Sequence, residues 1–279
     1  MRFPPTDLPV ALPCVMGIVN VTPDSFSDGG QHADTGSAVA HGLRLAAEGA
    51  AILDIGGEST RPGAAPVPVD EELRRVVPVV EGLAAVSPAL LSVDTTKAAV
   101  VRAALDAGAT VVNDVTALRG DPAMAALVAE RGCPVCLMHM LGEPRTMQDD
   151  PRYGDVVAEV TAFLEARLAV AVAAGVREEQ VLLDPGIGFG KTLAHNLALL
   201  AHLDRIVAIG RPVVLGASRK RFIGALLGLD PGERAAGTVA TTVLGFARGA
   251  AVLRVHDVRP NVEALRVAQA ILGAEPASA

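Results

Sequence analysis

Residues 181–191 read VLLDPGIGFGK and show how this chain is organised. A short run of apolar residues, 181–183, ends in the carboxylate of Asp184. Continuous apolar runs are typical of strands buried on both faces, as in parallel sheets. The proline and glycines that follow can neither continue a strand nor begin an ordinary helix, so they predict an open loop. The stretch therefore predicts a buried strand that displays an acid at its carboxyl end.

The same arrangement recurs along the chain. Similar apolar runs lie at 16–20, 51–54, 90–94, 110–114, 135–139, 213–216 and 251–256. Segments with apolar residues at every third or fourth position predict helices at 36–49, 69–86, 96–107, 122–131, 154–175, 194–206, 232–248 and 260–272. Alternating strands and helices require parallel strands with right-handed crossovers, and eight such units close a barrel filled by side chains. The expected fold class is α/β, a TIM (β/α)8 barrel, with an open doubly wound sheet as the alternative.

The composition is that of one domain with a large aliphatic core. The chain has 279 residues, of which 51% are hydrophobic and only 3% are aromatic. A single α/β barrel of about 250 residues fits this length, and no linker or low-complexity segment divides the sequence. We therefore expect one domain over residues 1–279, with an N-terminal extension at 1–13 and a frayed tail at 274–279.

Charge and cysteine content narrow the partners and the compartment. No apolar run approaches the roughly 20 residues that span a bilayer, and the N-terminus has no secretory signal pattern. Three cysteines give no disulfide framework, which favours a cytoplasmic protein. The lack of a spanning run predicts no membrane partner. Because the net charge is −7, we expect no nucleic-acid partner, and local positive groups must hold any bound anion.

Polar residues gather at the carboxyl ends of the predicted strands, where the loops of a barrel build its site. They are Asn20, Asp54, Asp94, Asn113, Asp184, Lys220 and His256. The loops at 20–30 and 56–63 are rich in small and hydroxyl side chains, which is typical of mobile lids. Residues 219–221 place three cations at an expected helix start, a common anion site in barrels. Arg254 and His256 are two residues apart and so share one face of a strand.

Eight segments of the chain together resemble the dihydropteroate synthases of folate biosynthesis. They lie at 16–30, 54–63, 93–97, 113–114, 137–140, 183–191, 218–220 and 254–258. The resemblance covers roughly residues 14 to 272, with the segments in the order that the family shows. Such a combination is far more specific than any single glycine-rich loop.

The resemblance implies an enzyme that joins 6-hydroxymethyl-7,8-dihydropterin diphosphate to p-aminobenzoate, giving 7,8-dihydropteroate and pyrophosphate. Mg²⁺ is the implied cofactor, because the charge of a leaving diphosphate must be neutralised. Asn20 is the implied metal ligand. Since the amine is a weak nucleophile, we expect the pterin carbon to ionise first, with Asp94 stabilising the cation. The implied catalytic residues are Asp94, Lys220, Arg254, His256 and, in the first lid, Asp28.

The same resemblance assigns residues to three subsites. The pterin residues are Asp94, Asn113, Met138, Asp184, Gly216 and Lys220, whose polar members match the donors and acceptors of the ring edge. The diphosphate residues are Asn20, Thr60, Arg61, Arg254 and His256. The p-aminobenzoate residues are Phe26, Thr60, Pro62, Phe189, Lys220 and Ser218. The substrate carboxylate is expected near Ser218 and Arg221, although serine can stand at the Arg221 position in the family, which leaves that contact open.

Several single features also have simpler explanations. A lone aspartate such as Asp184 is often a helix N-cap, and residues 186–192 do not complete a phosphate-binding loop pattern. Cys133 and Cys136 have the C-x-x-C spacing but are expected to pack in the core. His139 stands at a strand end, where a structural role and a catalytic role are equally consistent with the sequence.

Two other functions remain alternatives. A pterin-dependent methyltransferase also reads a pterin from strand ends, but it should lack the STRP segment at 59–62 and the SRK segment at 218–220. A non-catalytic pterin-binding paralogue should have lost lid residues, and no such loss is found. Members of the family that the chain resembles are usually homodimers. The expected partners are therefore the two small-molecule substrates and a second copy of the chain.

Overall fold

The computed structural model describes residues 2–22, 30–61 and 63–274, and its strands form a closed parallel barrel. Neighbouring strands pair in sequence order, and β1 pairs with β8 to close the ring. The strands are β1 (Cys14–Asn20), β2 (Ile52–Gly56), β3 (Leu90–Asp94), β4 (Val111–Asp114), β5 (Val135–Met138), β6 (Val181–Asp184), β7 (Val213–Leu215) and β8 (Ala250–Val255). The predicted TIM barrel is confirmed.

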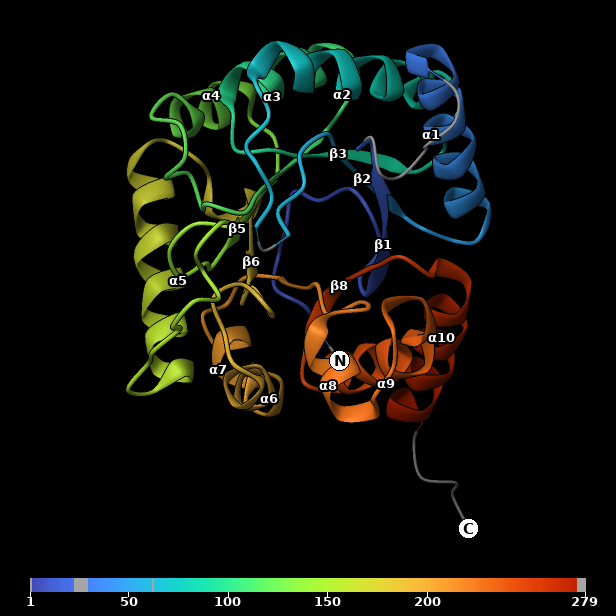
Figure 1. Cartoon of the computed structure of the whole chain (residues 1–279). Helices are drawn as coiled ribbons and strands as arrows, with labels where there is room; N and C mark the ends of the chain where they lie inside the picture. The colour runs from blue at the N-terminus through green and yellow to red at the C-terminus, as the bar shows by residue number, and fades with distance from the viewer. Residues whose placement is uncertain (1, 23–29, 62, 275–279) are drawn as a thin grey trace.

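Helices surround the barrel on all sides, as Figure 1 shows. They are α1 (Gly30–Ala47), α2 (Val69–Ala84), α3 (Ala98–Asp106), α4 (Met124–Arg131), α5 (Val156–Ala173), α6 (Leu193–Ala201), α7 (Leu203–Val207), α8 (Arg221–Leu227), α9 (Ala235–Ala247) and α10 (Val258–Gly273). Two short 3-10 helices, η2 (Glu178–Gln180) and η3 (Pro231–Glu233), lie in the connections. Each predicted helical segment overlaps at least one of these helices.

The structure differs most from the predicted helices in three places. Helix α1 begins at Gly30, before the predicted start at residue 36. The single helix predicted at 194–206 is divided between α6 and α7, because His202 has non-helical torsions of φ −119° and ψ 33°. Helix α8 begins at Arg221, within the helix start expected at 219–221, but no range was predicted for it because its seven residues are too few to show a helical period.

The interior of the barrel has an apolar lower layer and a polar upper layer. Side chains alternate across each strand, so every second residue points inward. The lower inward positions are buried and almost all apolar: Met16, Ile52, Val111, Cys136, Leu182, Val214 and Val252. Two residues further along the same strands stand Ile18, Asp54, Asn113, Met138, Asp184, Gly216 and Arg254. The period of the strands therefore brings residues from distant parts of the chain together at one mouth.

The N-terminal extension covers the other end of the barrel. Leu8 is buried against the lower apolar layer, and Phe3 packs on it from outside. The segment is attached at Asp7, whose N–H donates to the carbonyl oxygen of Glu179 at 2.8 Å and whose carboxylate lies 2.6 Å from Nη2 of Arg177. Because this end is closed by side chains, ligands reach the interior from the opposite mouth.

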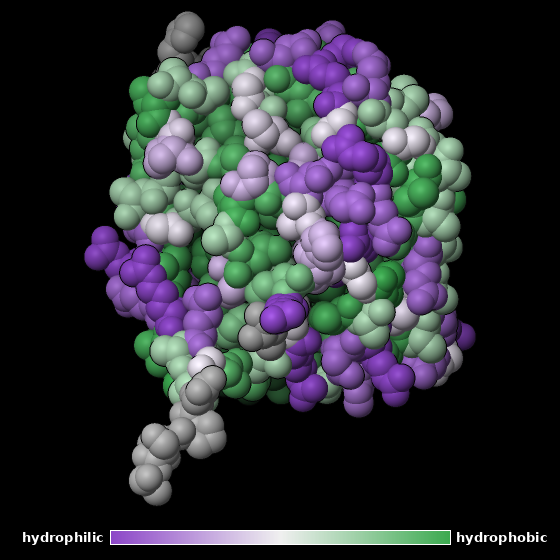
Figure 2. Space-filling view, turned by 180° about the vertical axis from the view of Figure 1, so that it is seen from behind, coloured by the Kyte–Doolittle hydropathy of each residue, from purple (hydrophilic) through white to green (hydrophobic). Residues whose placement is uncertain are grey.

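The outer surface mixes hydrophilic and hydrophobic residues, and Figure 2 shows them interspersed over the face turned away in Figure 1. Within the part of the chain that the structure describes, no helix has the length and apolar character needed to cross a membrane.

Candidate active site

Arg254 lies at the centre of an ionic cluster at the polar mouth of the barrel. Its Nε donates to Oδ2 of Asp54 at 2.6 Å, and its Nη2 donates to Oδ2 of Asp94 at 2.8 Å. Nδ2 of Asn113 donates to the same oxygen of Asp54 at 3.0 Å. These side chains come from β8, β2, β3 and β4, and the closure of the barrel brings them together. Asp54, which was predicted only as a polar strand end and was assigned to no subsite, is a central member.

One guanidinium in this cluster faces two carboxylates, so the charges do not cancel. Burial and the Asp54 carboxylate raise the pKa of Asp94 to about 7, against the opposing charge of Arg254. Burial alone would lower the pKa of Arg254, but Asp54 and Asp94 raise it. Oδ1 of Asp54 and Oδ1 of Asp94 are buried without a hydrogen-bond partner among the described residues. Because such unpaired acceptors cost free energy, a ligand that donates N–H groups there is favoured.

A second acid and a lysine stand across the mouth from this cluster. Asp184 is 5% exposed, and burial raises its pKa. A β-carbon at Gly216 would lie 3.6 Å from Oδ2 of Asp184 and 3.8 Å from Nζ of Lys220, so the absence of a side chain leaves room beside both. Nζ of Lys220 donates to the carbonyl oxygen of Ile187 and lies 4.6 Å from the centre of the Phe189 ring. Burial lowers the pKa of Lys220 to about 8, although Asp184 acts in the opposite direction.

The glycine-rich loop after β6 is held in one conformation. Gly186 has φ 66°, and a β-carbon there would collide with the carbonyl oxygen of His139. Its N–H donates to Oδ1 of Asp184 at 2.6 Å. The N–H of Gly188 donates to Oδ1 of Asn196 at 2.7 Å, and its carbonyl oxygen accepts from Nε2 of Gln148 at 2.5 Å. These contacts fix the position of Asp184 and of the loop that carries Phe189.

Lys191 is a buried residue of this loop that sequence reasoning left without a role. Its Nζ lies 2.9 Å from Nδ1 of His139 and donates to the carbonyl oxygen of Phe189 at 3.0 Å. Burial and the nearby Lys220 lower the pKa of Lys191 to about 7. Burial and the charge of Lys191 lower the pKa of His139 to about 3, so this histidine is neutral. His139 also packs edge-on against the ring of Phe163, with ring centres 4.8 Å apart, which gives it a structural place.

The turn after β7 is joined to the end of β8. Oγ of Ser218 lies 3.0 Å from Nδ1 of His256 and accepts the backbone N–H of His256 at 3.1 Å. Arg219 donates through Nε and Nη2 to the carboxylate of Asp257, at 2.9 and 2.5 Å. Burial lowers the pKa of His256 to about 3, and the positive charges of Arg254 and Arg219 lower it further. A neutral His256 therefore faces the mouth in a fixed orientation.

The loop after β2 is anchored at its first residues. Nζ of Lys97 donates to the carboxylate of Glu58 and, at 2.5 Å, to Oε2 of the fully buried Glu72. Nη1 of Arg75 donates to the carbonyl oxygen of Gly57 at 2.9 Å. The base of the predicted second lid is thus fixed by α2 and by the residue that precedes α3, while Thr60 and Arg61 extend beyond it.

A cavity of about 740 Å³ opens at this mouth. Most of the predicted site residues line it: Asn20, Thr60, Arg61, Asp94, Phe189, Ser218, Lys220, Arg254 and His256, as well as Arg221. Asn113, Met138, Asp184 and Gly216 are not among its lining residues, and they lie deeper, in the upper layer of the barrel. Met138 joins a small apolar cluster with Val115, Met140 and Met147, against which Phe189 packs. The predicted residues Phe26, Asp28 and Pro62 lie outside the described residues.

Asn20 is the described residue that best fits the implied Mg²⁺. Its side chain is half-buried at the end of β1, and it lines the cavity together with His256. Within residues 2–22, 30–61 and 63–274, no group of three or more His, Cys, Asp or Glu could hold a metal ion. Mg²⁺ is usually held by one or two protein oxygens together with substrate phosphates, so the donor set fits a metal that arrives with a diphosphate.

Comparison with known proteins decides the family. The family model described as "Pterin binding enzyme" matches residues 16–256. The dihydropteroate synthase of Escherichia coli (strain K12) is 49% identical over 270 residues, which cover 97% of this chain and 95% of the relative. The chain belongs to the dihydropteroate synthase family.

Two solved structures of dihydropteroate synthase from Xanthomonas albilineans agree with this assignment. The structure with 4-aminobenzoic acid has a TM-score of 0.90 and 57% identity and covers 94% of both chains. The structure with 7,8-dihydropteroate has a TM-score of 0.86 and 54% identity and covers 94% of this chain and 95% of the other. The chain is accordingly a transferase of folate biosynthesis, as the resemblance implied.

Proposed function

We propose that this chain condenses 6-hydroxymethyl-7,8-dihydropterin diphosphate with p-aminobenzoate at the polar mouth of its barrel, giving 7,8-dihydropteroate and pyrophosphate. The observation that carries this proposal is the juxtaposition of buried acceptors and cations at one mouth. Asp54, Asp94 and Asp184 offer acceptor oxygens, while Lys220 and Arg254 stand between them. A flat ring with several N–H donors and an attached diphosphate matches both kinds of group.

The deep part of the mouth is the proposed ring subsite. The carboxylates of Asp184 and Asp94 accept ring N–H groups, and Asn113 completes the edge with an amide that can donate and accept. Lys220 donates to a ring acceptor. Gly216 lacks a side chain beside Asp184 and Lys220, and Met138 adds an apolar wall. A site of this kind binds the matching ring much more tightly than other ligands, because a mismatched ligand leaves buried polar groups unpaired.

The diphosphate is proposed to lie nearer the rim of the cavity. Asn20, Thr60, Arg61, Arg254 and His256 all line the cavity there and supply N–H and O–H donors. Mg²⁺, when bound with Asn20, would neutralise part of the charge on the diphosphate oxygens. The neutral His256 donates from the ring nitrogen that does not face Ser218.

The proposed reaction begins by breaking the bond between the pterin methylene carbon and the diphosphate oxygen. The electron pair leaves with the oxygen, and Arg254 and His256 stabilise the developing negative charge. The pterin ring delocalises the positive charge of the carbon, and the Asp94 carboxylate stabilises it when ionised. The neutral amine of p-aminobenzoate then attacks the carbon and releases a proton to solvent. Because both substrates are held in the orientation for reaction, the amine does not need a strong base to activate it.

The p-aminobenzoate subsite is proposed beside the rings of the outer mouth. Phe189 and the stem of Lys220 offer apolar walls for the benzoate ring, and Thr60 lies across the cavity. Ser218 is already bonded to His256, so the exposed Arg221 is the better proposed partner for the substrate carboxylate. The roles predicted for Phe26, Asp28 and Pro62 remain predictions, because these residues lie outside the described ranges.

A homodimer is also proposed, formed by the outer faces of α8, α9 and α10. Leu227 contacts the position of Gly237, so α8 lies against α9, and α9 packs on α10. Large apolar residues are exposed on these three helices: Leu226, Leu227, Leu244, Val267, Ile271 and Leu272. Sedimentation of the protein and of a Leu244→Glu variant tests this, since the charged variant should be monomeric. A cytoplasmic location is proposed as well, supported by the three buried free cysteines.

The reaction is tested with purified protein, the pterin diphosphate, p-aminobenzoate and Mg²⁺. Dihydropteroate and pyrophosphate should form in equal amounts, and chelation of Mg²⁺ should lower the rate. An Asn20→Ala variant should need a higher Mg²⁺ concentration for half-maximal rate, whereas Asn196→Ala, which alters the glycine-rich loop instead, should not. Absence of product from folded wild-type protein would contradict the proposal.

A further inference from the structure

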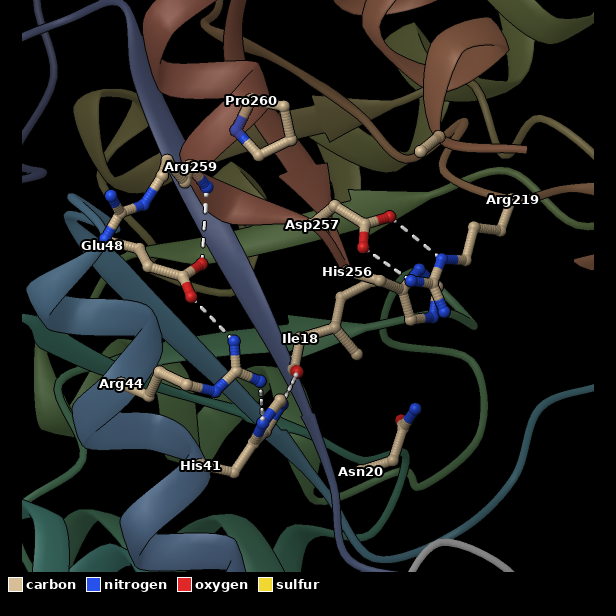
Figure 3. A pocket seen from close by; sticks show the side chains of 11 residues that line it. Ile18, Asn20, His41, Arg44, Glu48, Arg219, His256, Asp257, Arg259 and Pro260 are labelled. Atoms are coloured by element: carbon tan, nitrogen blue, oxygen red, sulfur yellow. Dashed lines mark hydrogen bonds and ion pairs between the residues drawn. The ribbon is translucent and has the colours of Figure 1, made fainter. Parts of the chain in front are cut away.

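A second opening lies beside the diphosphate residues, between α1 and α10. It has a volume of about 530 Å³ and is shown in Figure 3. Ile18, Asn20, Arg219 and His256 line both this groove and the cavity at the mouth. The groove is therefore an outward continuation of the subsite proposed for the diphosphate.

The groove exists because the barrel opens between β1 and β8. Pairing between these strands ends at Gly17 and Val255, whereas β1 continues to Asn20 along β2. The carbonyl oxygen of Ile18 is thus left without a strand partner on this side, and Nε2 of His41 donates to it at 3.3 Å. The His41 side chain of α1 therefore pairs with this carbonyl oxygen, where a backbone N–H of β8 would otherwise donate.

The hydrogen bond between His41 and Ile18 also fixes the orientation of Arg44, which lines the groove. A carbonyl oxygen can only accept, so Nε2 of His41 carries the proton and Nδ1 accepts from Nη2 of Arg44 at 2.8 Å. Nη1 of Arg44 donates to Oε1 of Glu48 at 2.7 Å. Burial and the charge of Arg44 lower the pKa of His41, which agrees with a neutral ring. A guanidinium has five N–H donors, so Arg44 keeps donors for a further partner.

Two more arginines line the groove. Arg219 is held by Asp257 through two hydrogen bonds and keeps its remaining N–H groups. Arg259 stands at the start of α10, and its backbone N–H lies 3.4 Å from Oε2 of Glu48. Its guanidinium has no hydrogen-bond partner among the described residues and is exposed. Figure 3 shows the Arg44, Glu48 and Arg259 group on one side of Ile18 and the Asp257 and Arg219 pair on the other.

The sum of these charges favours an anion. Three arginines face two carboxylates, and both histidines in the groove are neutral, so the local charge is positive in a chain whose net charge is −7. An anion drawn from solvent is repelled by the protein as a whole and attracted only where cations exceed acids. In the proposed function the leaving pyrophosphate is held beside Asn20 and His256, and both residues also line the groove.

We propose that the groove between α1 and α10 is a second binding site for inorganic pyrophosphate, adjoining the catalytic subsite on the route by which this product leaves. The proposal rests on the proposed function, since it places the departing diphosphate at Asn20 and His256. Arg44, Arg219 and Arg259 hold the anion, and His41 positions Arg44.

Calorimetric titration with inorganic pyrophosphate and Mg²⁺ tests the site in the full-length protein. The wild type should bind two pyrophosphates per chain, a tighter one at the catalytic subsite and a weaker one in the groove. Arg44→Gln and Arg259→Gln should each weaken only the second binding, about tenfold, as expected for removal of one charge-assisted contact. Arg74→Gln is the matched control, because Arg74 is also paired with a glutamate on an outer helix and its side chain is 60% exposed, against 58% for Arg44.

Kinetic measurements distinguish the proposed groove site from the proposed catalytic reaction. Ala235 at the start of α9 lines the groove, whereas Ala236 is exposed and does not. Ala235→Leu should slow pyrophosphate release and leave the single-turnover formation of dihydropteroate unchanged, and Ala236→Leu should change neither. A single pyrophosphate site in the wild type, a second site unaffected by Arg44→Gln and Arg259→Gln, or equal loss in Arg74→Gln would overturn the proposal. Failure of the proposed function would instead remove dihydropteroate formation in every protein.

Discussion

Nε of Arg254 lies 2.6 Å from Oδ2 of Asp54, and this pair is where β8 meets β2 across the mouth of the barrel. The second carboxylate on the same guanidinium, Asp94, is left with a pKa raised to about 7 by burial and by the charge of Asp54. The site therefore holds a carboxylate whose ionisation responds to its neighbours near neutral pH.

Removing the charge of Asp54 should lower the pKa of Asp94. The ionised Asp94 accepts a ring N–H better than the protonated form, so the affinity for a bare hydroxymethylpterin should rise with pH through about 7 in the wild type. In Asp54→Asn the same rise should occur at lower pH, because one repelling charge is gone and Arg254 faces Asp94 alone. Calorimetry between pH 5 and 9 measures it, and Asp94→Asn should remove this rise. An unshifted midpoint in Asp54→Asn would show that the two acids do not interact.

The buried amine of Lys191 should make stability depend on pH. A lysine in the unfolded chain keeps its proton up to about pH 10, whereas burial lowers the pKa of Lys191 in the folded protein to about 7. The unfolded state thus holds more protons between these values, and stability rises with pH. In Lys191→Met this rise is absent. The free energy of unfolding, wild type minus variant, should grow by about 1.4 kcal/mol per pH unit near pH 8 to 9.

Urea unfolding of both proteins at several pH values measures that difference. His139 should not contribute in this range, because its pKa is lowered to about 3. A difference that stays constant from pH 7 to pH 9 would mean that Lys191 is protonated in the folded protein.

Arg254→Ala should affect turnover more than binding of the bare pterin. Loss of one group that stabilises departing charge typically lowers turnover about 10²- to 10³-fold. The variant also leaves Asp54 and Asp94 without their cation, so it should unfold more easily, by about 3–5 kcal/mol. Single-turnover rates are therefore measured at a temperature where circular dichroism shows the variant folded. Normal turnover, or an equal loss of bare-pterin binding, would place Arg254 in a different subsite.

The polar residues at the strand ends could be predicted from the sequence because the pattern that marks a strand end lies within a few neighbouring residues. An apolar run ending in Asp184 or Asp94 predicts an acid at a strand end, and the closure of eight units brings such ends together. The inward period of two likewise places Arg254 and His256 on one face. These features depend only on spacing along the chain.

Partners across the barrel could not be read in the same way. The pairing of Arg254 with Asp54 joins residues 200 positions apart and depends on the register between strands. The bond between Lys191 and His139 depends on how a glycine loop folds over β5, which no periodic pattern encodes. Helix α8 is too short to show a period, and the break at His202 between α6 and α7 depends on packing.

In the proposed function, one mouth of the barrel holds two adjoining subsites, one for the pterin ring and one for the diphosphate. The most direct test of this arrangement is a calorimetric comparison of wild type, Asp184→Asn and His256→Ala, each titrated with the bare pterin and with pyrophosphate and Mg²⁺. Asp184→Asn should lose about 2–4 kcal/mol of pterin binding, because a buried ring donor is left poorly paired, and should keep its pyrophosphate affinity. His256→Ala should show the reverse. If each variant loses both ligands to the same extent, or Asp184→Asn binds the pterin normally, the division into two subsites is wrong.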